Sequence, residues 1–134
     1  MILLDTGALL LVANGTPLAK PAVDAMMAVA DSPGAICVSP ISAWEIGALV
    51  ARGRIALSLE PGAWFQAAVD AGLSLAPMTP EILVAASNLP ACRLRDPADR
   101  ILAATARAGR YRLITRDGPL LDYAAAGHVT ATAC

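Results

Sequence analysis

Four acidic residues stand where strands are expected to end or helices to begin, and together they could hold a metal ion. They are Asp5, Glu45, Asp99 and Asp117. Asp5 follows the apolar run 1–4, Asp117 closes the run 113–116, and the carboxyl ends of parallel strands share one edge of a sheet. Carboxylates gathered at that edge would repel one another unless a hard cation such as Mg²⁺ or Mn²⁺ lay between them. The pattern therefore indicates metal-dependent chemistry on phosphodiesters.

Three of the acids also have a structural interpretation when each is taken alone. Asp5 could cap the helix that follows it, and Asp117 could be a turn residue before a glycine. Asp96 is expected to be the N-cap of a helix that begins at Pro97. Asp99 then lies in the first turn of that helix, where an acid favours the helix dipole. The functional interpretation of these residues rests on the whole set.

Glu45 is harder to explain structurally. Ser42 and Glu45 have the spacing of a capping box. However, Ser39 and Pro40 already begin the helix, which places Glu45 nearly two turns inside it. Its neighbours on this helix are apolar, so the carboxylate needs either solvent or a partner. A cation is one such partner.

Length and composition indicate one globular domain, residues 1–134. A chain of 134 residues can bury a proper core, and much of its 57% hydrophobic content is alanine, which favours closely packed helices. No apolar run reaches the ~18 residues that span a bilayer, so no membrane partner is expected. The first residues do not resemble a signal peptide, so a cytoplasmic protein is expected. The three cysteines include no C-x-x-C pair and are expected to be reduced thiols.

Basic residues are concentrated in one part of the chain although the net charge is only −1. Seven of the ten lie between positions 93 and 116, all of them arginine: Arg93, Arg95, Arg100, Arg107, Arg110, Arg112 and Arg116. Arginine is the side chain best suited to bidentate contact with phosphate. These residues could be solvated charges at helix ends, but they flank two of the four acids. Phosphate-binding groups beside a metal site are what a nuclease needs.

The alternation of apolar runs and helical stretches predicts an α/β fold, with a central, mainly parallel five-stranded sheet flanked by helices on both faces. Strands are expected near 1–4, 35–38, 73–76, 112–115 and 128–130. Helices are expected near 7–12, 20–31, 40–52, 61–71, 80–87, 97–108 and 118–124. Three of these helices begin with a capping residue followed by proline: Ser39-Pro40, Thr79-Pro80 and Asp96-Pro97.

Some other residues are interpreted as structural. Val23, Met26, Met27 and Ala30 have the spacing of a core-facing helix stripe. Trp44 and Trp64 are interpreted as core or subunit-interface residues, and His128 as a strand or edge residue with no general-base role.

Taken in order along the chain, the acidic motifs resemble those of the PIN-domain ribonucleases, specifically the VapC toxins of bacterial toxin–antitoxin pairs. The resemblance runs from end to end. It rests on the segments 3–6 (LLDT), 41–46 (ISAWEI), 96–106 (DPADRILAATA), 115–117 (TRD) and 120–123 (LLDY). One departure is Gly7, which stands where the family often has a bulkier residue and which could alter the rim of the cleft.

The resemblance implies a site and an activity. The metal and catalytic positions fall on Asp5, Glu45, Asp99 and Asp117, supported by Thr6, Asp96 and Thr115. The implied activity is an endoribonuclease that hydrolyses RNA by water activated at a carboxylate-held Mg²⁺ or Mn²⁺ ion and leaves 5′-phosphate and 3′-hydroxyl ends. Arg100 and Arg116 are candidates for holding the RNA backbone. The implied partners are a VapB-like antitoxin that covers the catalytic groove and a second copy of the chain in a homodimer.

Two other function classes fit less well. A non-catalytic RNA-binding or regulatory PIN-like module would not need a complete acidic set. A response-regulator receiver would need paired acids after the first strand and a lysine after a late strand. Here Asp5 stands alone, and the one lysine is Lys20.

Overall fold

The computed structural model describes residues 1–134 and contains one five-stranded sheet in the order β3-β2-β1-β4-β5. The strands are β1 (Ile2–Leu4), β2 (Ile36–Val38), β3 (Ser74–Leu75), β4 (Arg112–Thr115) and β5 (Thr130–Ala133). Every neighbouring pair is parallel. The central strand β1 pairs with β2 and β4, so that Leu4 lies beside Val38 and Ile114. The predicted parallel sheet is therefore confirmed.

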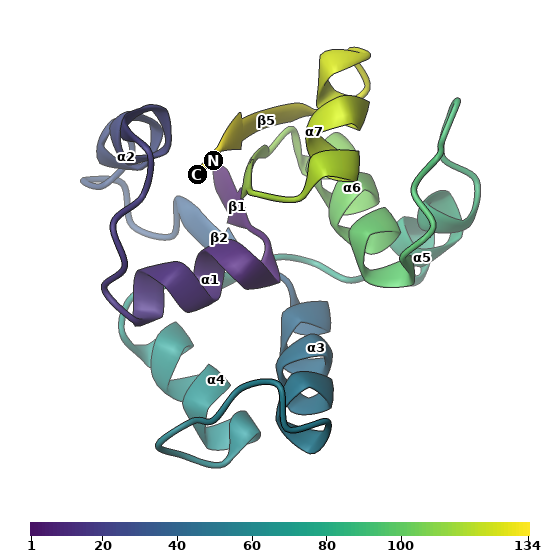
Figure 1. Cartoon of the computed structure of the whole chain (residues 1–134). Helices are drawn as coiled ribbons and strands as arrows, with labels where there is room; N and C mark the ends of the chain where they lie inside the picture. Colours follow the sequence, from purple (N-terminus) through teal and green to yellow (C-terminus); the bar gives the residue numbers. More distant parts are fainter.

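Seven helices connect and cover these strands (Figure 1). They are α1 (Thr6–Ala13), α2 (Lys20–Met27), α3 (Pro40–Ala51), α4 (Pro61–Asp70), α5 (Pro80–Ser87), α6 (Pro97–Gly109) and α7 (Gly118–Ala125). The three predicted proline starts are confirmed, because the side chains of Ser39, Thr79 and Asp96 each accept a backbone N–H at the start of α3, α5 and α6.

Two element boundaries predicted from the sequence were wrong, and one predicted core-facing helix stripe was only partly right. Helix α2 ends at Met27 and not near residue 31, since turn and bend residues follow it up to Pro33, and a residue before proline disfavours the helical conformation. Ala22 is the buried residue of α2, and Met26 packs partly buried against the core, whereas Val23 and Met27 are exposed, Met27 by 69%. Only part of the expected stripe therefore faces the core. Strand β5 begins at Thr130, because Gly127 turns the chain with a φ of 89° after α7.

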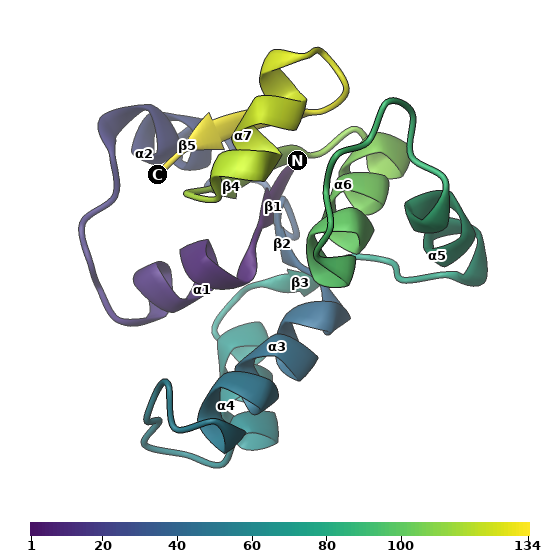
Figure 2. The same ribbon diagram turned by 45° about the vertical axis from the view of Figure 1, so that its right-hand side comes forward.

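The core has two parts, one on each face of the sheet. Along β1, Leu3 packs with α5, α6 and α7 on one face, whereas Ile2 and Leu4 pack with α1, α2, α3 and α4 on the other. Figure 2 shows α5, α6 and α7 grouped apart from α1, α3 and α4. Both faces are covered by helices, as predicted. None of the helices, the longest with 13 residues, could cross a bilayer.

Candidate active site

Asp5 lies directly after β1, at the carboxyl edge of the sheet, and is the N-cap of α1. Only 7% of it is exposed. One carboxylate oxygen, Oδ1, accepts the backbone N–H of Ala8 at 2.6 Å. The other oxygen, Oδ2, accepts the hydroxyl of Thr115 at the end of β4. Asp5 is therefore held from its own helix and from the neighbouring strand.

Thr115 connects Asp5 to Asp117. Its side chain is completely buried. While the hydroxyl donates to Asp5, its oxygen accepts the backbone N–H of Asp117 at 2.9 Å. The side chain of Asp117 caps α7 by accepting the N–H of Leu120 at 3.0 Å. A single hydroxyl thus sets the relative position of two acids that are far apart in sequence.

Glu45 reaches the same edge from α3 through a contact with α1. Its Oε1 accepts the hydroxyl of Thr6 at 2.5 Å. Thr6 Oγ1 also lies 2.9 Å from the hydroxyl oxygen of Ser42, which is completely buried. Since a threonine hydroxyl carries one proton, Thr6 can donate in only one of these contacts. Ser42 was not among the predicted site residues, although its place three residues before Glu45 puts both on one face of α3.

Asp96 and Asp99 come from the start of α6. Asp96 is exposed and caps the helix by accepting the N–H of Ala98 at 2.9 Å. Asp99 is half-buried, and its side chain forms no hydrogen bond. The pKa of Asp99 is raised to about 7, most of all by burial and then, in decreasing order, by the charges of Asp117, Asp96, Glu45 and Asp5. Because those charges act on Asp99, the structure brings all the predicted acids into one neighbourhood.

The pKa values of the other buried acids are raised as well. Burial is also the largest cause of the raised pKa values of Asp5 and Glu45. Hydrogen bonds from Thr115 and Thr6 oppose the rise but do not cancel it. No basic side chain forms an ion pair with these acids, since the one salt bridge joins Lys20 and Asp24 on the exposed side of α2. The site therefore carries negative charge that the protein does not neutralise.

This donor set fits a hard divalent cation. All donors are carboxylate or hydroxyl oxygens, which Mg²⁺, Mn²⁺ and similar ions prefer. No three Asp, Glu, His or Cys side chains form a preformed cage of ligands around one metal position. Mg²⁺ does not require such a cage, because it usually keeps several waters and binds one or two carboxylates directly. The chemistry and the unneutralised charge both favour a partly hydrated ion.

The two arginines predicted to hold RNA differ. Arg100 donates through Nε to the carbonyl of Ala86 at 2.8 Å and through Nη1 to that of Leu94 at 2.9 Å. These bonds tie α6 to the end of α5 and to the segment before α6, which argues against an RNA contact by Arg100. Arg116 is exposed between β4 and α7 and lies beside the acids. The RNA-contact prediction therefore rests on Arg116.

The remaining aromatic predictions have mixed outcomes. Trp64 packs against the core on the α1 side of the sheet, as expected. Trp44, next to Glu45 on α3, is 61% exposed and is not a core residue. His128 is not a strand residue, since it precedes β5. Its ring stacks on the ring of Tyr123 with a centroid distance of 4.7 Å.

Comparisons with known proteins identify the family of the chain. The model of the PIN domain family matches residues 2–126. Ribonuclease VapC22 of Mycobacterium tuberculosis is 32% identical over 88 residues, which cover 66% of this chain and 67% of that protein.

Two solved structures share the fold. VapBC2 from Rickettsia felis, bound to a DNA fragment from its promoter, has a TM-score of 0.65 at 15% identity and covers 99% of this chain and 98% of its own. FitAB bound to the IR36 DNA fragment has a TM-score of 0.61 at 18% identity and covers 99% and 94%. From its motifs, its family match and its relative, this chain belongs to the PIN-domain family and is of the VapC type.

Proposed function

We propose that this protein, a single PIN domain over residues 1–134, is a metal-dependent endoribonuclease toxin that a VapB-like antitoxin neutralises. The observation that carries the proposal is the convergence of Asp5, Glu45, Asp99 and Asp117 without a basic partner. Burial, together with the neighbouring acids, raises the pKa of Asp99 to about 7. Such a cluster is costly for a folded chain unless a cation binds to it. The similarity to Ribonuclease VapC22 supports RNA as the substrate.

The residues of the chain have distinct roles in this proposal. Asp5, Glu45, Asp99 and Asp117 hold the Mg²⁺ or Mn²⁺ ion. When bound, the ion supplies a water of lowered pKa and offsets the charge on the phosphate. Thr115 fixes Asp5 relative to Asp117, and Thr6 orients Glu45. Asp99, which is free of hydrogen bonds, can turn toward the ion. Asp96 begins the helix that carries Asp99.

Substrate binding is assigned to the exposed arginines beside the acids. Arg116 leaves the end of β4 one residue before Asp117, and no ion pair engages it. A guanidinium at this place can bind the phosphate groups that flank the cleaved bond. With RNA as the substrate, the proposed place of the activity is the cytoplasm.

The partners proposed are a VapB-like antitoxin and a second copy of the chain. The fold is shared with the VapBC2 and FitAB structures. Large apolar side chains remain exposed on several helices, among them Trp44 on α3 and Leu83 and Val84 on α5. Uncovered apolar side chains of this size are typical of interaction surfaces. A monomer at micromolar concentration in size-exclusion chromatography would contradict the homodimer.

The direct test uses protein freed of any copurifying antitoxin and incubated with total bacterial RNA. New 5′ ends are mapped with Mg²⁺, with Mn²⁺ and with EDTA. The same assay is run on Asp99→Asn and on the control Asp70→Asn, an exposed residue at the end of α4. Discrete cuts that require the metal and vanish only in Asp99→Asn are expected. RNA binding without cuts under any condition would favour the alternative, a non-catalytic RNA-binding module.

A further inference from the structure

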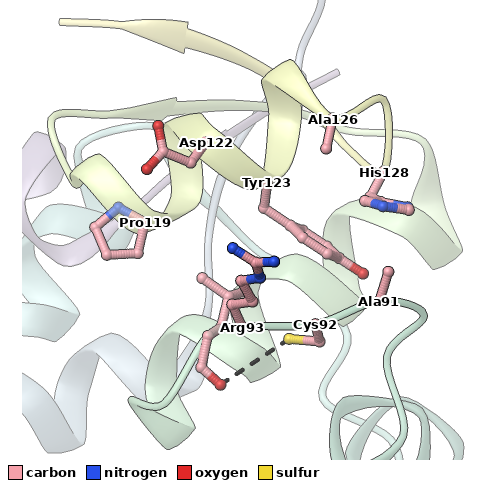
Figure 3. A pocket seen from close by; sticks show the side chains of 9 residues that line it. Ala91, Cys92, Arg93, Pro119, Asp122, Tyr123, Ala126 and His128 are labelled. Carbon is pink, nitrogen blue, oxygen red and sulfur yellow. Dashed lines mark hydrogen bonds between the residues drawn. The ribbon is translucent and has the colours of Figure 1, made fainter.

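An open groove runs between α7 and the segment that precedes α6, outside the carboxylate cluster. Its cavity volume is about 930 Å³, within the range of ligand pockets. Residues 91–94 form one wall, and residues of α7 with His128 form the other. Figure 3 shows Arg93 on the first wall facing Asp122 and Tyr123 on the second.

One end of the groove lies near the proposed active site. Leu94 lines the first wall two residues before Asp96, and Pro119 lines the second two residues after Asp117. Asp96 and Asp117 both lie close enough to Asp99 to raise its pKa. From Pro119 the second wall follows α7 for roughly 10 Å at 1.5 Å per residue. The end of the groove at Leu94 and Pro119 therefore lies close in sequence to two of the acids, on the elements that carry them.

The groove presents groups that suit an unstacked nucleotide. Arg93 is exposed and forms neither an ion pair nor a hydrogen bond with the protein, so its planar guanidinium is free to stack or donate. Asp122 is exposed on the facing helix, where a carboxylate can accept from the exocyclic amino group of a base. Single-stranded RNA is recognised by such stacking and base-edge contacts.

The far end of the groove is rigid. The hydroxyl of Tyr123 donates to the carbonyl of Pro90 at 2.7 Å, which ties α7 to the first wall. The ring of His128 stacks on Tyr123 with an interplanar angle of 24°, and the guanidinium of Arg107 donates to the backbone carbonyl of His128. Because these bonds hold both walls, the groove keeps its shape without a ligand.

We infer that this groove is a nucleotide subsite that reads one base beside the cleaved phosphate, with Arg93 and Asp122 as its specificity-determining residues. The inference rests on the proposed ribonuclease function and adds a source of sequence preference to it. The nearness of one end of the groove to the carboxylates and a free arginine favour RNA over a protein segment as the occupant. The base expected here carries an exocyclic amino group, since Asp122 can only accept.

The test uses a pool of short single-stranded RNAs of randomised sequence, cleaved by wild type, Arg93→Ala and Asp122→Asn. The matched controls are Arg54→Ala, after α3, and Asp31→Asn, after α2, both exposed and remote from the groove. We expect Arg93→Ala to lower kcat/KM about tenfold, as the loss of one stacked base does. Asp122→Asn should change the base preferred at one position beside the cut by several-fold. The controls should match wild type.

A binding measurement separates the failure of the subsite from that of the ribonuclease function. The same RNA pool is bound to Asp99→Asn protein with and without Arg93→Ala, and affinity is read by fluorescence anisotropy. Weaker binding with Arg93→Ala supports the subsite even if no cleavage is found. If wild type cuts and both groove variants cut at the same positions and rates, the subsite is wrong, the nuclease stands, and the groove is left to a protein partner.

Discussion

Two carboxylates cap helices in this protein in the same way but lie in opposite electrostatic environments. Glu60, at the start of α4, accepts the N–H groups of Gly62 and Ala63 at 2.9 and 3.1 Å. Asp5, at the start of α1, also accepts two bonds, one from the backbone N–H of Ala8 and one from the side-chain hydroxyl of Thr115. Yet the pKa of Glu60 is lowered by its two backbone bonds, whereas burial raises the pKa of Asp5.

The difference shows how the carboxylate cluster of Asp5, Glu45, Asp99 and Asp117 lowers the stability of the folded chain. Glu60 is fully exposed and therefore keeps its hydration, so its bonds favour the charged form. Asp5 has lost most of its hydration and lies beside Asp117, so the bonds cannot compensate. The cap of α4 stabilises the folded chain above the ordinary pKa of a glutamate, and this contribution is lost as the pH falls. The raised pKa values of the cluster have the opposite effect, because they make the folded chain less stable as the pH rises. This cost favours the interpretation of the cluster as a ligand-binding site.

The largest expected effect comes from removing a charge in the cluster and not in the cap. Asp99→Asn should lower RNA cleavage by at least about a hundredfold, because loss of a metal ligand exceeds the 10–100-fold cost of losing its outer partners. Glu60→Gln should leave cleavage unchanged, since Glu60 caps a helix at a distance from the acids. Cleavage rates of both variants are compared after circular dichroism has shown that they are folded. Full activity in Asp99→Asn would refute the site.

The next effect concerns the hydroxyl that joins Asp5 to Asp117. Thr115→Val removes the donor to Asp5 and the acceptor for the N–H of Asp117, and we expect a 10–100-fold loss in metal affinity or cleavage. Thr105→Val is the matched control, because Thr105 is equally buried but bonds only to the carbonyl of Ile101 within α6. Metal titrations of cleavage should separate the two variants. Equal losses in both would mean that Thr115 is only structural.

The pH should change metal binding at the cluster. Because the pKa of Asp99 is raised to about 7, protons compete with the cation below this pH. The Mg²⁺ concentration for half-maximal cleavage should rise by up to about tenfold per pH unit from pH 7 to 6, and it should be nearly constant above pH 8. Mg²⁺ titrations at a series of pH values measure this. A flat dependence from pH 6 to 8 would contradict the raised pKa.

Stability without metal should also distinguish the cluster from the cap. The pKa of Asp99 is raised from 3.8 to about 7, so stability falls as the pH rises through this window and is greatest below it. Asp99→Asn should therefore increase the free energy of unfolding at pH 8 in EDTA by about 1 kcal/mol. Glu60→Gln should decrease it slightly at the same pH. Urea unfolding at pH 8 and pH 4 tests both signs, and destabilisation by Asp99→Asn would contradict the first.

The smallest expected effect is that of Arg116 at the rim of the cluster. Arg116→Ala should weaken RNA binding several-fold for all sequences alike and reduce the slope of log affinity against log salt by about one. Arg52→Ala, at the exposed end of α3, is a control of equal charge change. Binding isotherms at several salt concentrations give the slopes. An unchanged slope in Arg116→Ala would remove this residue from the RNA path.

Several features of the fold could be predicted because they depend on local sequence. Proline at the first helical position has its φ already set, and the residue before it caps the free N–H groups. The starts of α3, α5 and α6 followed from this rule. Short apolar runs separated by helices predicted the parallel sheet, and parallel strands place Asp5 and Asp117 at one edge. These parts of the site were therefore visible in the order of residues.

The tertiary structure decided what depends on residues distant in sequence. Thr115 and Asp5 are 110 positions apart, and their bond exists because β1 and β4 pair. Arg100 looked free to bind RNA, but the packing of α5 against α6 brings the Ala86 carbonyl within reach of its guanidinium. The raised pKa of Asp99 likewise needs burial and, besides the nearby Asp96, three acids from other elements: Asp117, Glu45 and Asp5. Local sequence determines where helices begin and which residues cap them, whereas the charge and hydration of a site depend on which distant segments the fold packs together.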